Sequence, residues 1–589
     1  MPMILARPLC AFALAALMAE AGLAQTAGAH AVTAPATVQA EPGPGDAGAY
    51  LAARVAAAES DYRAAGAWYS RALAGDETNP GLLDGALISA MALGSFDVAV
   101  PLAQRLLDLG AQSQPAALAI LTDKAQRGEF DAILADAAAG ASVNELVDGL
   151  VLAWSQLGAG KMSEALEGFD TLAATEGLEA FGLYHKALAL ASVGDFEGAD
   201  AILSGEAGGK LRMMRRGTVA HVQILSQLER GDEAVALLDS TFGTGQDAGI
   251  DALRARLVAG ETLAYDVTRN ATDGMAEVFF TLATAISGEA DDAYTLLYTR
   301  AATHLRPDHA EALLMSASLL GLQKQYQLAS ETFARIPTDD PMFFVAEIGR
   351  ADALYADGKT EAALEVLQNL TRSHGDLMQV HLALGDALRR AERFAEAVPA
   401  YDAAIARIPE PQGQHWPLFY SRGMSQERLG NWPEAEADMR RALELDPDQP
   451  QVLNYLGYSF VDRGENLDEA LKMIERAVAA RPDSGYIIDS LAWAYFRLGR
   501  YADAVEPMEK ASLLEPVDPV VTDHLGDVYW AVGRRLEAQF QWRRALSFDP
   551  AEKDATRIRR KLEAGLDVVL QAEGAEPISL TVTEGDDGN

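Results

Sequence analysis

Cysteine is almost absent from this sequence, because Cys10 is the only one in 589 residues. It lies in a region that we interpret below as an export signal, so an exported product would contain no disulfide. A lipid-bearing cysteine follows a small residue, whereas Cys10 follows Arg7, Pro8 and Leu9, and the apolar run comes after it. We therefore expect no lipid anchor.

Basic residues are also scarce. The chain has 48 Lys and Arg against 86 Asp and Glu, so 48 − 86 gives a net charge of −38. DNA, RNA and anionic membrane surfaces repel a chain of this charge, which excludes nucleic-acid binding. Aromatic residues make up only 7%, as expected of helices that pack through small residues.

Long apolar runs are missing as well, since no segment reaches the roughly 20 residues that a membrane-spanning helix needs. The start of the chain resembles a secretory signal, with Arg7, a short apolar run from Leu9 to Met18 and the small residues of Gly22-Leu23-Ala24. We predict a signal peptide over 1–24 and a flexible leader, rich in Ala, Pro, Thr and Gly, over 25–48. The expected location of the product is the bacterial periplasm.

Motifs that hold cofactors or carry out catalysis are not found. Residues 43–48 match GxGxxG but follow no strand, and there is no GxxxxGK[ST], HExxH, CxxC or GxSxG. His304 and His309 are five residues apart across a predicted helix end, and we interpret them as solvated rather than as metal ligands. The sequence predicts a protein that is not an enzyme and binds no cofactor or metal.

Two basic clusters stand out against this acidic background. The first contains Lys210, Arg212, Arg215 and Arg216, and the second spans Arg557–Lys561. Each fits a solvated helix end, the interpretation we favour, or a docking site for an acidic partner or phospholipid head groups.

The clearest positive signal is a repeat between Pro447 and Pro550. Prolines recur at 447, 482, 516 and 550, and small or apolar residues recur in phase ahead of them. The recurring columns are Gly423, Gly457, Ala492 and Gly526; Ala435, Ala470, Ala504 and Ala538; Met439, Ile474, Met508 and Trp542; and Ala442, Ala477, Ala511 and Ala545.

This pattern, L-G-x2-Y…A-x3-F…P, resembles the tetratricopeptide repeat (TPR), in which each unit is a pair of antiparallel helices. Neither helix can bury its apolar stripe alone, so we predict an all-α fold, a right-handed α-solenoid. Small residues such as Gly457 and Ala470 would let the paired helices approach closely. Gly430, Gly499 and Gly533 would follow the first helix of their pairs with positive φ.

The phase of the repeat divides the chain further. We predict degenerate repeats over 49–270, a regular array over 271–550, a capping helix over 551–572 and a disordered acidic tail over 573–589. Twelve to fourteen helix pairs are expected at the 34-residue period of this repeat.

The resemblance implies that the first helix of each unit lines a concave surface, where partners bind. The stripe of those helices that faces away from the paired helix contains Tyr420, Asn454, Tyr458, Asp489, Trp493, Phe496, Asp523, Asp527 and Trp530. Aromatic residues beside acids suit a protein partner with apolar and basic side chains. An equally open interpretation is that the large rings simply pack between adjacent first helices.

A narrower resemblance covers 454–546. The segments NYLGYSFVDRG, DSLAWAYFRLGRY and DHLGDVYWAVGR are similar to the C-terminal block of proteobacterial envelope TPR proteins. Some members are lipoprotein adaptors that present substrates to carboxyl-terminal processing proteases. The resemblance implies such a protease and its substrates as partners, although the missing lipidated cysteine is a departure. The alternative is an assembly factor for outer-membrane or secretion machinery.

Overall fold

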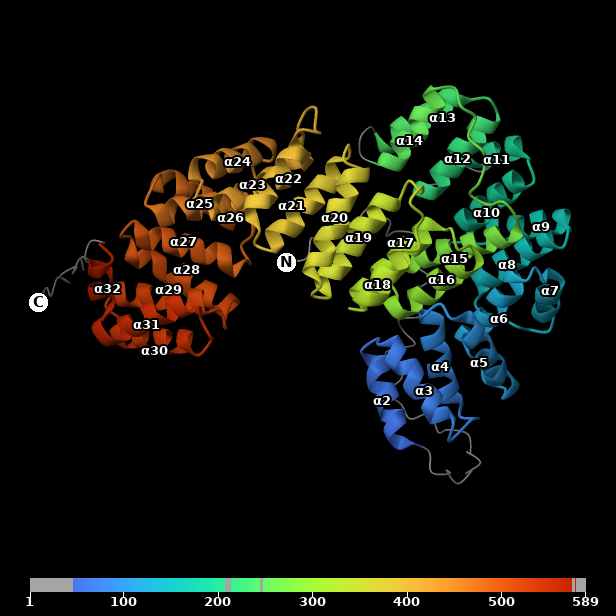
Figure 1. Ribbon diagram of the computed structural model, residues 1–589, viewed down its shortest axis with the longest axis horizontal. Coiled ribbons are helices and arrows are strands. Elements are labelled where there is room, and N and C mark those ends of the chain that lie inside the picture. Colours follow the sequence, from blue (N-terminus) through green and yellow to red (C-terminus); the bar gives the residue numbers. More distant parts are fainter. Residues whose placement is uncertain (1–45, 207–212, 244–246, 575–577, 579–589) are drawn as a thin grey trace, which may run out of the picture. The chain divides into compact units, whose positions relative to one another are not determined.

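The computed structural model describes residues 46–206, 213–243, 247–574 and 578. This part of the chain is built from α-helices and one short 3₁₀ helix, without a β-strand, so the predicted all-α solenoid is confirmed (Figure 1). The predicted signal peptide and nearly all of the predicted leader lie outside the described residues. Of the predicted acidic tail, only residues 573, 574 and 578 are described.

The chain divides into two compact units, which meet in the sequence at His374 and Gly375. The first unit contains α2 (Ala47–Ala58), α3 (Tyr62–Leu73), α4 (Pro80–Ala92), α5 (Phe96–Asp108), α6 (Gln114–Gln126), α7 (Phe130–Ala138), α8 (Glu145–Gly158), α9 (Met162–Ala173), α10 (Glu179–Ser192), α11 (Phe196–Leu203), α12 (Arg215–Gln227), α13 (Gly231–Phe242), α14 (Ala248–Val258), α15 (Ala271–Ile286), α16 (Asp292–Leu305), α17 (Ala310–Leu322), α18 (Tyr326–Phe333), α19 (Phe343–Ala356) and α20 (Thr360–Ser373).

The second unit is the more regular of the two. It contains α21 (Met378–Arg390), α22 (Phe394–Ile405), η1 (Gly413–His415), α23 (Trp416–Arg428), α24 (Trp432–Leu445), α25 (Pro450–Arg463), α26 (Leu467–Ala480), α27 (Gly485–Arg497), α28 (Tyr501–Leu514), α29 (Pro519–Ala531), α30 (Arg535–Leu546), α31 (Glu552–Ala564) and α32 (Leu566–Ala572). Apart from α14 and the last two helices, the described helices form fourteen consecutive pairs, the upper end of the predicted range.

The turns of the second unit follow from its glycines. Gly430, Gly499 and Gly533 have φ of 81°, 73° and 83° and each lies two residues after a first helix, as predicted. The connection between α25 and α26 has three residues, like its equivalents, and the extra residue of this repeat lengthens α25. Gly464 and Asn466 both adopt positive φ in this connection.

The seam, the line along which the two helices of a pair touch, requires small side chains. A Cβ on Gly457 would lie 2.8 Å from Ile474 Cγ1 and 3.1 Å from the carbonyl oxygen of Ala470. At Gly526 the corresponding atom would lie 2.4 Å from the Trp542 ring. The glycine column therefore sets how closely the backbones approach, and the larger residue opposite it fills the space.

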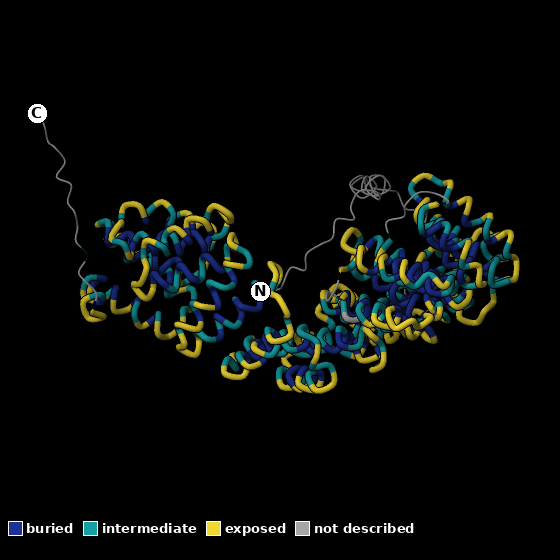
Figure 2. Tube along the Cα trace, turned by 90° about the horizontal axis from the view of Figure 1, so that it is seen from above, coloured by how far each residue is buried: buried dark blue, intermediate teal, exposed yellow. Residues whose placement is uncertain are grey.

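Successive first helices of the second unit, such as α25, α27 and α29, pack against one another, whereas successive second helices do not. The array therefore curves toward its first helices. Figure 2 shows the buried residues running along the helix pairs and the exposed residues gathered at the turns.

The segment predicted as one capping helix forms two, α31 and α32. Gly565 separates them with φ of 88°, and a Cβ there would lie 2.7 Å from the Trp530 ring. The helix ends at this residue because the chain must turn sharply while it contacts a large aromatic side chain.

We predict that Gly457→Leu lowers the unfolding free energy by about 1–3 kcal/mol, because the added side chain overpacks the seam. Thermal unfolding followed by circular dichroism measures the loss. Gly321→Leu is the matched control, since a Cβ at this helical glycine meets no atom within 4 Å. Equal melting temperatures for the Gly457 variant and the wild type would contradict the seam described above.

Candidate partner-binding surface

In the first unit, a later helix pair covers the surface formed by the first helices of four earlier pairs. The pair α15–α16 packs against α4, α6 and α8, which precede it by more than 100 residues, and against α10 (Figure 1). The Thr272 hydroxyl donates to the carbonyl oxygen of Ala125 at 3.2 Å, and Arg300 Nε donates to that of Ala92 at 2.9 Å. Phe279 and Tyr298 of this pair are fully buried. The surface formed by the first helices α4, α6, α8 and α10 is therefore occupied by the chain itself.

A buried ionic network holds this arrangement. Arg216 Nε donates to Glu277 Oε2 at 2.6 Å, and its Nη1 donates to Glu311 Oε2 at 3.1 Å. The hydroxyl of Tyr184 donates to Glu277 Oε1 at 3.0 Å. Burial alone would raise the pKa of Glu277, but the Arg216 guanidinium and the nearby His309 hold it well below the ordinary value.

The network corrects two expectations from the sequence. Arg215 and Arg216 are not a solvated helix end, since they pair with Asp247, Glu277 and Glu311. The other two members of that cluster, Lys210 and Arg212, lie outside the described residues. His309 is not solvated either, because it is buried 3.5 Å from Glu277. The acids that neutralise these groups are distant in sequence, so local charge patterning could not identify them.

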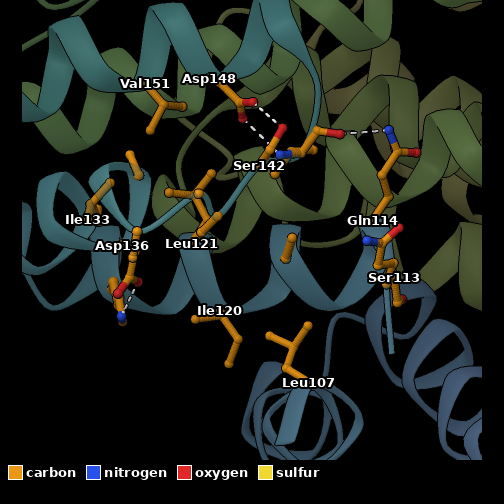
Figure 3. Close-up of a pocket in the computed structure, with 18 of the residues that line it drawn as sticks. Leu107, Ser113, Gln114, Ile120, Leu121, Ile133, Asp136, Ser142, Asp148 and Val151 are labelled. Atoms are coloured by element: carbon orange, nitrogen blue, oxygen red, sulfur yellow. Dashed lines mark hydrogen bonds and ion pairs between the residues drawn. The ribbon is translucent and has the colours of Figure 1, made fainter. Parts of the chain in front are cut away.

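A cavity of about 780 Å³ lies among α5, α6, α7 and α8 (Figure 3). Leu107, Ile120, Leu121, Ile133 and Val151 form much of its apolar wall. The polar groups around it bond to one another, as the amide of Gln114 does to the carbonyl oxygen of Val143 at 2.7 Å. The cavity is thus an apolar space between helices and presents no set of convergent reactive groups.

The predicted surface residues of the second unit all lie on first helices. Tyr420 is on α23, Asn454 and Tyr458 are on α25, Asp489, Trp493 and Phe496 are on α27, and Asp523, Asp527 and Trp530 are on α29. They form two groups. Five of them are buried, namely Asp489, Trp493, Phe496, Asp523 and Asp527, whereas Trp530 and the residues on α23 and α25 are only partly buried.

The two predicted carboxylates on α29, Asp523 and Asp527, form ion pairs with a buried lysine of the same chain. Lys561 of α31 is 1% exposed, and its Nζ donates to Asp523 and Asp527, with shortest distances of 2.7 Å to each. Trp542 Nε1 also donates to Asp527, at 2.9 Å. Burial and the adjacent charge of Asp527 raise the pKa of Asp523. The predicted solvated helix end at Arg557–Lys561 is therefore wrong for Lys561, and Asp527, at 0% exposure, is not accessible to a partner.

On α27 the predicted residues form a stack. The Trp493 ring lies 4.8 Å from Phe496 and 4.1 Å from His524, nearly parallel to both. His524 Nδ1 lies 3.0 Å from Asp489 Oδ1. Burial lowers the pKa of His524, but the Asp489 carboxylate and neighbouring acids outweigh it and raise the pKa above 6.5. Trp493 is 8% exposed, so most of its ring contacts the protein itself.

The cap contacts Trp530, which is partly buried. Its Nε1 donates to Asp567 of α32 at 2.9 Å, and the Arg535 guanidinium lies 4.9 Å from its ring centre. The C-terminal end of the first-helix surface is therefore closed by α31 and α32, through Lys561 on one side and Asp567 on the other.

The accessible part of the surface lies on α23 and α25. Tyr420, Met424, Asn454, Tyr455 and Tyr458 are all partly buried there. Tyr455, which the repeat alignment did not single out, contacts Tyr420 edge to face at 5.8 Å and donates to Glu427 at 3.2 Å. We call these five residues the tyrosine surface.

Its chemistry is aromatic and uncharged. Burial raises the pKa of both Tyr420 and Tyr458 to about 12, with the Asp489 charge adding to the effect on Tyr458. Both hydroxyls therefore remain protonated donors at neutral pH. The buried Oδ1 of Asn454 has no hydrogen-bond partner among the described residues. The tyrosine surface thus offers flat apolar rings together with hydroxyl donors.

The described residues contain neither a membrane-spanning helix nor a cluster of metal ligands. No helix among them has the length and apolar character to cross a membrane. No cluster of three or more His, Cys, Asp or Glu side chains in these residues could hold a metal ion.

Comparison with known families locates the repeat. The profile of the tetratricopeptide repeat matches residues 348–410, 420–485 and 463–513. The TPR repeat-containing protein PA4667 of Pseudomonas aeruginosa is 29% identical over 191 residues, which cover 32% of this chain and 31% of that protein. The TPR repeat-containing protein YpiA of Bacillus subtilis is 21% identical over 215 residues, 36% of this chain and 49% of that one. The chain thus spans half or less of the length of these relatives.

Among solved structures, the Cut9 and Hcn1 hetero-tetramer of the APC/C is similar over 88% of this chain and 96% of the matched chain, with 16% identity and a TM-score of 0.37. The family match places tetratricopeptide repeats within residues 348–410 and 420–513, and the helix pairs show an all-α TPR solenoid fold.

We predict that Arg216→Met destabilises the protein by about 3–5 kcal/mol, because it leaves the buried Glu277 carboxylate without its guanidinium. Urea unfolding followed by circular dichroism measures this loss. Adding Glu277→Gln removes the stranded charge, so the double variant should be more stable than the single one. A single variant as stable as the wild type would show that the network does not hold the first unit together.

The ion pair of His524 predicts a pH dependence. Its folded pKa is raised above 6.5, so the pair stabilises the protein at low pH, and this contribution is lost as the pH rises through the folded pKa. Unfolding free energies of the wild type and His524→Asn, measured across this range, should therefore converge as the pH increases. Asp489→Asn should remove the same dependence. Parallel pH profiles for the wild type and the His524 variant would contradict the assignment.

Proposed function

We propose that this TPR protein is a scaffold that binds a protein partner on the tyrosine surface. One observation carries the proposal: α15–α16 covers the first helices α4, α6, α8 and α10 of the first unit, whereas Tyr420, Tyr455 and Tyr458 of the second unit are only partly buried. A solenoid that leaves one such surface uncovered has a place for another chain.

The side chains present limit the kind of segment that fits. Tyrosine rings supply large contact area at a small entropic cost, which makes them common anchors of protein interfaces. Three acids of the first helices already have cationic partners within the chain. Asp489 faces His524, and Asp523 and Asp527 face Lys561. These carboxylates therefore attract a basic partner less than their number implies. The matching segment carries apolar side chains, and it has backbone groups that pair with the tyrosine hydroxyls.

The biological role that we propose is that of an exported adaptor. Residues 1–24 support export, because their composition is that of a secretory signal. The block from 454 to 546 supports an adaptor role, because it is similar to envelope proteins that deliver substrates to carboxyl-terminal processing proteases. In this role the tyrosine surface binds the protease or its substrate.

A pull-down from periplasmic extract tests the proposal, with the chain from residue 25 onward as bait. Tyr420→Ala with Tyr458→Ala should lose the partner while far-UV circular dichroism is retained, since both side chains are only partly buried. Tyr50→Ala is the control, because that tyrosine is exposed on α2 of the first unit.

The identity of the captured protein separates the roles. Capture of a processing protease or cell-wall hydrolase that depends on the two tyrosines supports the adaptor. Capture of outer-membrane assembly or secretion components instead supports the assembly factor. A partner that binds the tyrosine variant as well as the wild type contradicts the tyrosine surface, and an uncleaved product in the cytoplasm contradicts export.

A further inference from the structure

The outer side of α30 carries two large apolar side chains that no described residue covers. Leu536 is 82% exposed and Phe540 is 65% exposed. They are four residues apart, so they lie one above the other on the same side of the helix. The opposite side of α30 is the buried one, where Ala538, Trp542 and Ala545 pack into the core.

The repeat itself shows that these two positions are unusual. The positions equivalent to Leu536 in α24, α26 and α28 hold Pro433, Asp468 and Ala502, and those equivalent to Phe540 hold Ala437, Lys472 and Glu506. Elsewhere in the regular array these positions are thus small, charged or proline, as a solvated outer position allows. The last complete repeat alone replaces both with large apolar residues, so packing within the chain does not explain them.

The charges beside this pair are arranged in a self-complementary order. Glu537 precedes Phe540 by three residues and Arg544 follows it by four, so the two charges are seven residues apart and lie on the same flank of α30. Glu537 pairs only at the exposed surface, with Arg534 at 3.2 Å. Arg544 bonds to Gln541 and to the carbonyl oxygen of Pro516 and has no acidic partner among the described residues.

We propose that the outer side of α30 binds the same side of α30 on a second copy of this chain, antiparallel, about a two-fold axis near Phe540. This arrangement packs Phe540 against Phe540 and brings both Leu536 side chains to the contact. On one flank it sets Glu537 of each copy opposite Arg544 of the other. A purely acidic or purely basic partner would match only one of these two charges, which favours the second copy.

The small area of the contact between the two copies of α30 limits the expected affinity of the dimer. One helix stripe buries less than the roughly 1,200 Å² of a standard stable interface, so association should be weak and should depend on concentration. Local concentration, as on a shared partner, would then decide how much dimer forms.

Sedimentation velocity of the full chain over a concentration series tests the proposal. The wild type should shift from monomer to dimer as concentration increases, and Leu536→Ser with Phe540→Ser should remain monomeric with an unchanged melting temperature. Leu322→Ser is the matched control, because Leu322 is 71% exposed on α17 of the first unit and should leave the association unchanged. A wild type that is monomeric throughout, or a dimer that the double serine variant forms equally well, overturns the proposal.

The charged flank tests the antiparallel orientation. Glu537→Arg alone and Arg544→Glu alone should each weaken association by about tenfold or more, since each places like charges opposite one another. The two changes in one chain should restore it, and this rescue also shows that neither change acted by unfolding α30. If the single changes weaken association and the double change does not restore it, the antiparallel orientation is wrong. If neither the charge reversals nor the double serine variant changes association, the second copy is not the occupant of this surface.

Discussion

The close approach of paired helices across columns of glycine and alanine is the constraint on which this structure depends. Because Gly457 has no side chain, its helix lies within contact distance of Ile474 and of the backbone at Ala470. A pair packed in this way still exposes apolar side chains on its flank, so it must stack on a neighbour. The array, its curvature and the surface formed by the first helices all follow from that one requirement.

The two units use this surface differently. In the first unit the chain returns along its own first helices, and α15–α16 covers them with buried side chains such as Phe279 and a network centred on Glu277. In the second unit the cap covers only the C-terminal end, through Lys561 and Asp567. The tyrosine surface, on α23 and α25 of the second unit, is only partly buried, and this is why we assign partner binding to it. The acidic excess of the chain has little part in this assignment, since the acids nearest the surface are neutralised internally.

Local features of the sequence predicted the repeat well. The proline spacing, the small-residue columns and the positive-φ glycines indicated helix pairs, and the same phase placed Tyr420, Asn454 and Tyr458 on first helices, where they lie. Features that depend on distant residues could not be predicted in this way. Arg216 and His309 looked solvated because their acid, Glu277, is far along the chain, and Lys561 looked solvated because Asp523 is 38 residues before it. The repeat pattern also could not predict that α15–α16 packs against α4, α6, α8 and α10, because the sequence of these two helices resembles that of any other pair.

Hydrogen exchange of the amides in α15 and α16, measured on the full chain, tests most directly whether the first unit closes its own surface. If the pair is part of the core, its amides should exchange as slowly as those of α8 and α10, and they should become labile only when the unit unfolds. Fast exchange confined to α15–α16, with α8 and α10 still protected, would mean that the pair leaves the surface readily. The first unit would then be able to bind a partner as well, and the assignment to the tyrosine surface would lose its basis.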